Sequence, residues 1–280
     1  MSRLFGFFLG IAMLFAVSTH AEIKSIQRFD EVVPFVDKNT LVLINISDTI
    51  YTSKTTMGRK KWRVFLKERV LNLIQNHPSD FANQLEGRIV QMSPKTLLDK
   101  NIPNDIKEMQ TTEAIVLGVT MKNRSPTYFN HFDERVTDHL HGFGINFSDS
   151  SIHFNEGKNQ PSIYKGVLFT EKTSYASALE KLYAKVPTLP RHIILIEDNL
   201  SELKDVEGFA NDAHIQYTGF HYVIAHNQAD AYDPVIGIIE FLALVKDGTL
   251  LTDDEAQTQR NKSDTEYYQL FDNWLIKNGS

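Results

Sequence analysis

The chain contains no cysteine, and this absence removes several classes of protein. It excludes a disulfide framework, a thiolate zinc site, thiol redox chemistry and a lipid anchor on cysteine for this chain. Exported eukaryotic domains of this size usually carry disulfides. An exported chain without cysteine therefore favours a bacterial periplasmic or secreted protein.

The chain also lacks internal repeats, low-complexity tracts and runs of basic residues. Its formal net charge of −6 gives no electrostatic footprint for nucleic acid. We therefore expect no nucleic-acid partner. The length is ample for one α/β domain with an insertion.

One long apolar run is present, and it lies at the N-terminus. Arg3 precedes residues 4–17, which carry no charge, and Thr19 and Ala21 place small side chains where a signal peptidase reads them. We expect a signal peptide over residues 1–21 and a periplasmic or secreted mature protein. An uncleaved anchor is the alternative. No later stretch approaches 18 apolar residues, so we expect no membrane span after the signal is removed.

Short apolar runs alternate with amphipathic helical stretches, which is typical of a parallel α/β sheet flanked by helices. The runs at 41–44, 114–119 and 193–196 have the continuous apolar character of strands buried on both faces, and 166–169 is a fourth candidate. The fold class expected is therefore α/β.

Residues 51–112 separate the first two of these strands and are too many for a simple crossover helix. We expect a cap-like insertion there, covering the strand ends. Residues 231–280 read as a C-terminal helical segment, and the whole of 22–280 as one domain with these additions.

Polar residues stand at the ends of three of these strands. Since the carboxyl ends of parallel strands meet at one edge of a sheet, these side chains are candidates for a common site. They are Asn45, Ser47, Thr120, Glu197 and Asp198.

The order of these motifs resembles the haloacid dehalogenase-like (HAD) phosphohydrolase superfamily over about residues 40–212. Its first motif is an apolar strand followed by Asp-x-Asp-x-Thr, and residues 45–49 here read Asn-Ile-Ser-Asp-Thr. The resemblance places Asn45 at the nucleophile and Ser47 at the general acid/base. It also implies a HAD-like Rossmannoid sheet, with the cap-like insertion after the first strand.

The resemblance further implies that Thr120 and a lysine contact phosphate. Lys172 best matches that lysine, and Lys165 is the second choice. The other interpretation makes Thr120 a strand-end hydroxyl bonded to backbone and Lys172 a solvated helix-start residue.

Both catalytic aspartates of the superfamily are replaced in this chain. An amide such as that of Asn45 has no anionic oxygen with which to attack phosphorus. The hydroxyl of Ser47 is far too weak an acid for proton transfer. We therefore expect phosphatase activity to be impaired or absent. Asp48 is one residue out of register, so strand alternation predicts that it points elsewhere.

Magnesium is the cofactor that the resemblance implies, with ligands from the first and fourth motifs. Glu197 and Asp198 would remain as acids, but Asn45 offers only a neutral amide oxygen. We expect magnesium binding to be weak or lost. The other interpretation makes Glu197 and Asp198 a capping pair before the next helix.

Three functions follow from these residues. The first is an exported HAD-like protein that binds a phosphorylated small molecule or a protein partner without hydrolysis. The second is an active magnesium-dependent phosphohydrolase with a non-standard residue set. The third is an interaction protein with a vestigial pocket. An ordinary doubly wound α/β domain remains the alternative fold.

Overall fold

The computed structural model describes residues 21–121, 131–147, 152–155, 157, 160–224 and 232–279. The expected signal peptide lies outside the described residues, except for Ala21. Within the described ranges, no helix combines the length and apolar character that crossing a bilayer requires.

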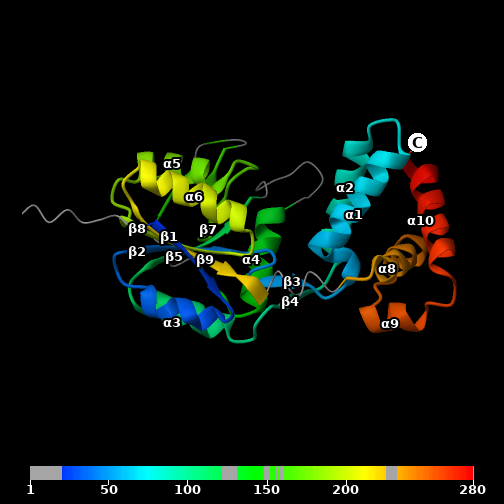
Figure 1. The fold of residues 1–280 in the computed structure, drawn as a ribbon, viewed down its shortest axis with the longest axis horizontal. Helices are drawn as coiled ribbons and strands as arrows, with labels where there is room; N and C mark the ends of the chain where they lie inside the picture. The colour runs from blue at the N-terminus through cyan, green and yellow to red at the C-terminus, as the bar shows by residue number, and fades with distance from the viewer. Residues whose placement is uncertain are drawn as a thin grey trace, which may run out of the picture.

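In the described part of the chain, seven strands form one sheet (Figure 1). All neighbouring strands are parallel except the edge pair β6 and β7, which is antiparallel. In sheet order the strands are β1 (Ala21–Ile26), β9 (Gln216–Tyr222), β8 (His192–Glu197), β2 (Thr40–Asn45), β5 (Ile115–Thr120), β7 (Val167–Phe169) and β6 (Ser162–Tyr164).

Helices cover both faces of this sheet, and Figure 1 shows them above and below it. On β2, Leu41 and Leu43 belong to one apolar cluster, whereas Val42 and Ile44 belong to the other. This alternation explains why the strand is apolar throughout. The helices are η1 (Phe29–Phe35), α3 (Ile102–Thr111) and α4 (Phe132–Gly142) on one face, and α5 (Tyr175–Lys185) and α6 (Leu200–Asp212) on the other.

The expected fold class is confirmed: the chain has an α/β, Rossmann-like fold with a mostly parallel sheet between helices. The strand expected at 41–44 is nevertheless not the first. β1 precedes it, and its sequence AEIKSI mixes polar and apolar residues because it lies at the edge of the sheet, where it is partly exposed.

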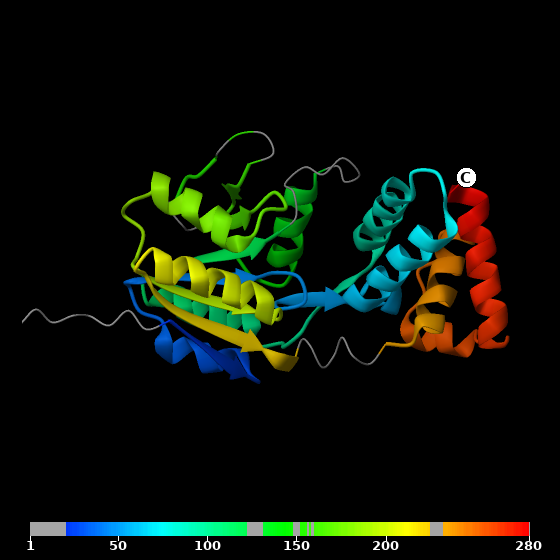
Figure 2. The ribbon, with the colours of Figure 1, turned by 45° about the horizontal axis from the view of Figure 1, so that its top comes forward.

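A second group of helices stands apart from the sheet (Figures 1 and 2). We call it the helical unit, and the sheet with its covering helices the sheet unit. The helical unit combines two segments that are far apart in the sequence. It consists of η2 (Thr56–Gly58), α1 (Lys60–Leu73), α2 (Pro78–Met92), α8 (Pro234–Asp247), α9 (Asp253–Thr258) and α10 (Asp264–Gly279).

The core of the helical unit forms around Trp62, whose ring lies 5.9 Å from the rings of Phe241 and Phe271. The indole Nε1 donates a hydrogen bond to Pro234 O at 3.2 Å. A Cβ at Gly237 would lie 2.1 Å from that nitrogen, so only glycine permits this close packing. The C-terminal helices therefore complete the core that α1 begins.

Two short antiparallel strands, β3 (Tyr51–Ser53) and β4 (Lys95–Leu97), connect the units. After β4 the chain returns to the sheet, where α3 buries Ile102, Ile106 and Met109 in the sheet's core. Within the expected 51–112 insertion, α3 thus belongs to the sheet unit as the crossover helix. The part that leaves the sheet lies before it.

Candidate functional site

The three polar strand ends lie side by side. β2 pairs with β8 on one side and β5 on the other, and these strands end at Asn45, Glu197 and Thr120. A cavity of about 270 Å³ opens at this edge, and we call it the strand-end cavity. Its wall brings together Asn45, Ser47, Thr120, Glu197 and Asp198.

The candidate lysines Lys172 and Lys165 do not line this cavity. Lys172 is exposed, and its backbone N–H donates to Met121 O at 3.0 Å. Lys165 lies in the turn between β6 and β7, with its ammonium 5.3 Å from the centre of the Tyr164 ring. The backbone at both lysines has positive φ, which places them in tight turns and not in a helix. A phosphate-contacting role for either lysine stays a prediction, and both lie outside the lining of the strand-end cavity.

Lys60 supplies a positive charge to the cavity from the first turn of α1. Its Nζ lies 3.2 Å from Asp198 Oδ2. Burial opposes the charge, but the nearby carboxylate of Asp198 outweighs it, so the pKa of Lys60 is raised. This cation comes from the helical unit, across from the strand ends.

The Asn45 side chain is the centre of the hydrogen-bond network. Its Nδ2 faces Glu197 Oε1 at 2.9 Å, Asp198 Oδ1 at 3.0 Å, Ser47 O at 2.9 Å and Thr49 Oγ1 at 3.2 Å. Because all four neighbours have acceptor oxygens, this amide orientation is the one that satisfies hydrogen bonding.

The other face of the Asn45 amide accepts a hydrogen bond. Tyr175 Oη donates to Asn45 Oδ1 at 3.1 Å. Tyr175 is the first residue of α5 and is buried, and burial raises its pKa well above the ordinary value of 10. It is therefore a neutral donor that fixes the amide.

The two acidic residues differ in their surroundings. Burial, followed by the neighbouring Asp198, raises the pKa of Glu197 well above 4.5, so Glu197 favours its neutral form. One of its oxygens accepts from the backbone N–H groups of Asp198 and Asn199 at 2.9 and 3.0 Å. Asp198 instead forms an ion pair with Lys60 at 3.2 Å.

This set of donors does not fit the magnesium ion of the HAD resemblance. A magnesium ion needs oxygen lone pairs directed at one centre. Here an N–H group of Asn45 faces Ser47 O and both carboxyl groups, so the amide uses the lone pairs that a metal would require.

Asp48 also lines the cavity wall, but its carboxylate is directed toward β3 and α1. Thr52 Oγ1 donates to Asp48 Oδ1 at 2.8 Å, and Arg63 Nη2 lies 3.9 Å from Oδ2. The backbone of Asp48 has a φ of 62°, a left-handed conformation that an aspartate tolerates. This turn separates Asp48 from the amide network.

Sequence reasoning missed Lys60 and Tyr175. A usable signal was present for Lys60, because Arg59, Lys60 and Lys61 stand together in the sequence where α1 begins. Cations at a helix N-terminus oppose the helix dipole, and such a local conflict marks a candidate site. Tyr175 carries no comparable signal.

Comparisons with known proteins identify bacterial relatives. An uncharacterised protein of Rickettsia prowazekii is 24% identical over 82% of this chain and 86% of its own length. A Chlamydia pneumoniae protein named "Putative outer membrane protein" is 22% identical over 97% of both chains. A Chlamydia trachomatis protein with the same description is 19% identical over 79% of this chain and 83% of its own.

No solved structure gives a significant match to the chain. One family model matches residues 22–257, which is most of the sequence. The chain therefore belongs to the family described as protein of unknown function (DUF2608).

Proposed function

We propose that this protein is an exported HAD-like protein that binds a phosphorylated small molecule in the strand-end cavity and does not hydrolyse it. The observation that carries the proposal is one cavity wall containing Asn45, Ser47, Thr120 and Asp198, with Lys60 beside them. Three neighbouring parallel strands present these groups, as a relation to the HAD superfamily requires.

Lys60 is the main anion-binding group in this proposal. An ammonium has three N–H donors, and the ion pair with Asp198 uses one of them. The remaining donors can contact phosphate oxygens, and charge-assisted hydrogen bonds of this type are strong. About half of the Lys60 side chain is exposed, so a ligand can reach it from solvent.

The same geometry supports the absence of hydrolysis. Nucleophilic attack needs an electron-rich oxygen, but Asn45 Oδ1 is a neutral amide oxygen that accepts from Tyr175. Proton transfer to a leaving group needs a titratable group, and Ser47 offers only a hydroxyl. Glu197 is held in the amide network, away from either role.

Export to the cell envelope is part of the proposal. The apolar N-terminal run with its small-residue cleavage site supports a signal peptide. The names of the Chlamydia relatives, which describe outer membrane proteins, are consistent with an envelope location. A fusion of residues 1–21 to a reporter active only in the periplasm tests this step directly.

The binding proposal is tested by titrating the purified mature chain with inorganic phosphate and vanadate in a thermal-shift assay. We expect both anions to raise Tm, because they bind the folded state alone. Lys60→Met should remove the part of the shift that binding in the strand-end cavity contributes. Lys107→Met is the matched control, since Lys107 is exposed on α3 and should leave the shift unchanged.

Two outcomes would contradict the proposal. Hydrolysis of aryl phosphates at rates typical of the superfamily, stimulated by magnesium and lost in Asp198→Ala or Asp48→Ala, would make the protein an active phosphatase. The absence of any anion-dependent shift would leave a vestigial pocket and favour a protein partner. Restoring both aspartates, with Asn45→Asp and Ser47→Asp, tests whether the rest of the site still supports phosphatase chemistry.

A further inference from the structure

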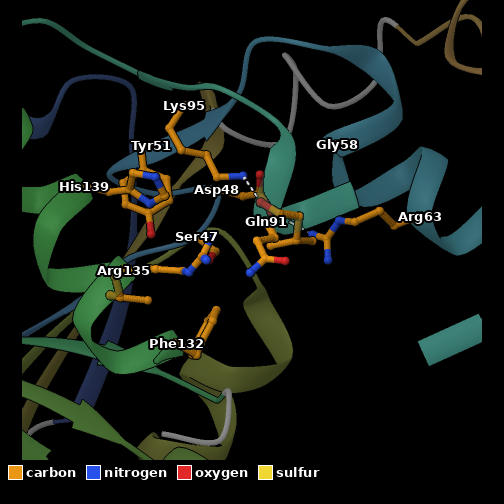
Figure 3. Close-up of a pocket in the computed structure, with 12 residues that line it drawn as sticks. Ser47, Asp48, Tyr51, Gly58, Arg63, Gln91, Lys95, Phe132, Arg135 and His139 are labelled. Carbon is orange, nitrogen blue, oxygen red and sulfur yellow. Dashed lines mark hydrogen bonds and ion pairs between the residues drawn. The ribbon is translucent and has the colours of Figure 1, made fainter. Parts of the chain in front are cut away.

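A second, smaller cavity lies where the sheet unit meets the connecting strands and the helical unit (Figure 3). Its volume is about 60 Å³, enough for a few water-sized groups, and we call it the basic pocket. It shares Ser47, Asp48 and Arg63 with the wall of the strand-end cavity. The two cavities are therefore neighbours.

Positively charged side chains enter the basic pocket from three elements. Arg63 comes from α1, Lys95 from β4 and Arg135 from α4, where His139 also lines the wall (Figure 3). Asp48 is the one carboxylate in this wall, among the described residues. The convergence of cations from elements that are distant in sequence is unusual unless an anion compensates it.

The carboxylates nearby neutralise only part of this set, since Asp48 Oδ2 lies 3.9 Å from Arg63 Nη2. Glu86, outside the wall, accepts from Arg63 Nη1 at 2.7 Å, but Arg63 Nε is buried and has no hydrogen-bond partner in the described part of the chain. Lys95 Nζ donates to the backbone oxygen of Val90 at 2.9 Å, and no carboxylate of a described residue forms an ion pair with it. A buried donor without a partner costs free energy unless a ligand satisfies it.

The pKa shifts of Lys95 and His139 agree with an excess of positive charge in the pocket. Burial, then the charge of Arg63, lowers the pKa of Lys95 to about 8. Burial, then Lys95 and Arg135, lowers the pKa of His139. Both groups are therefore buried beside cations, while Asp48 acts in the opposite direction on Lys95 and Asp138 does so on His139.

The shape of the pocket fits a small group. Tyr51, Val90, Phe132 and Val136 supply apolar walls, and apolar walls strengthen the attraction between a cation and an anion. Gln91, oriented with its oxygen toward Arg135, accepts from both terminal nitrogens at 3.0 and 2.8 Å. This contact holds the guanidinium of Arg135 at the α2 side of the pocket.

We propose that the basic pocket is a second anion-binding site that takes one small oxyanion, a phosphate or sulfate group, between Lys95, Arg63 and Arg135. An anion there contacts the sheet unit through Arg135 and the connecting strand β4 through Lys95. It therefore stabilises the arrangement of these two parts of the molecule. The site stands apart from the proposed function, because its cations are not those of the strand-end cavity except for Arg63.

The test is isothermal titration of the full mature chain with inorganic phosphate and, separately, with sulfate. We expect a binding event that Lys95→Met and Arg135→Gln each weaken by about tenfold or more, because each removes a charge-assisted hydrogen bond. Lys60→Met should leave this event unchanged. Arg88→Gln, on the exposed face of α2, is the matched control.

Arg135→Gln keeps the test decisive if Lys95→Met fails to fold, since Arg135 is exposed and its substitution removes little packing. Binding that neither variant weakens would overturn the second site. So would a single binding event that Lys60→Met abolishes, and that result would leave the proposed function standing. A single binding event that Lys95→Met abolishes and Lys60→Met leaves unchanged would support the second site and contradict the proposed function.

Discussion

The two sides of the strand-end cavity are built on different principles. The strand ends present neutral or mutually satisfied groups, such as the amide of Asn45 and the buried carboxyl of Glu197. The side formed by α1 presents cations, with Lys60 and Arg63 at its wall. The strand-end side of the cavity therefore holds groups that are hydrogen-bonded to one another, and the helical unit supplies the cations.

Under the proposed function, this difference means that loss of one chemistry does not imply loss of a site. In that proposal Asn45 and Ser47 stand where the reacting groups would be, while the hydrogen bonds of Asn45 hold the strand ends in order. The proposal assigns recognition to the helical unit. Four substitutions, from the largest expected effect to the smallest, test this division.

The first prediction tests whether the helical unit depends on its own core. Trp62→Ala should lower the free energy of unfolding by about 3–5 kcal/mol, because Trp62 is fully buried among aromatic rings. Both tryptophans of the chain, Trp62 and Trp274, lie in this unit, so Trp274 fluorescence in urea reports its unfolding. Leu71→Ala, at a half-exposed position of α1, should change stability by less than about 0.5 kcal/mol. Equal effects of the two changes would contradict the assigned core.

The second prediction tests the strand-end side of the cavity. Asn45→Asp should lower the free energy of unfolding by about 2–4 kcal/mol in metal-free buffer, because a third carboxyl group replaces the donor facing Glu197 and Asp198. Magnesium should restore part of this loss in the variant and have little effect on the unmodified chain. Asn104→Asp, an exposed amide on α3, is the control. A variant as stable as the parent without metal would break the comparison.

The third prediction concerns the junction of η2 and α8. Glu240 is buried and accepts from the backbone N–H groups of Thr56 and Met57, and burial, followed by Asp253, raises its pKa from 4.5 to about 8. The folded chain therefore holds a proton that the unfolded chain releases between these pH values. This contribution to stability is complete below pH 4.5 and is lost as the pH rises through 8, by at most about 1.4 kcal/mol per pH unit.

Glu240→Gln should remove this slope, because the amide does not titrate. Urea unfolding at several pH values between 5 and 8 measures the difference between the parent and the variant. Parallel profiles of the two chains would show that Glu240 is ionised in the folded protein.

The smallest effect is expected at the ion pair between the two sides. Lys60→Met should lower the free energy of unfolding by less than about 1 kcal/mol, because Lys60 is half exposed and solvent screens the pair with Asp198. The same change should remove anion binding at the strand ends. A large loss of stability would instead make Lys60 a structural residue, and urea unfolding at low and high salt separates the two cases.

The sheet was predictable from the sequence because its signals are local. The continuous apolar runs that became β2, β5 and β8 have a pattern that a strand buried on both faces requires. Their polar ends were predicted to share a site for the same reason, since parallel strands point their carboxyl ends at one edge. Asn45, Thr120 and Asp198 do lie on one cavity wall.

The cations were not predictable in this way. Lys172 was chosen by motif order, but the turn that holds it leaves the side chain exposed. Lys60 and Lys95 reach the cavities through the packing of α1, α2 and β4, which no short motif encodes. The partnership of α1 with α8 and α10 joins residues about two hundred positions apart, and neither helix alone reveals its partner.

The packing of α1 against α8 and α10 determines when the core of the helical unit can form during synthesis. The helix that begins at Lys60 emerges early, yet its tryptophan packs against Phe241 and Phe271, near the end of the chain. A nascent or truncated chain therefore exposes a large aromatic surface of the kind that chaperones bind. Loss of the last helix by proteolysis should turn a well-packed protein into one prone to aggregate, although every residue of the strand-end cavity is still present.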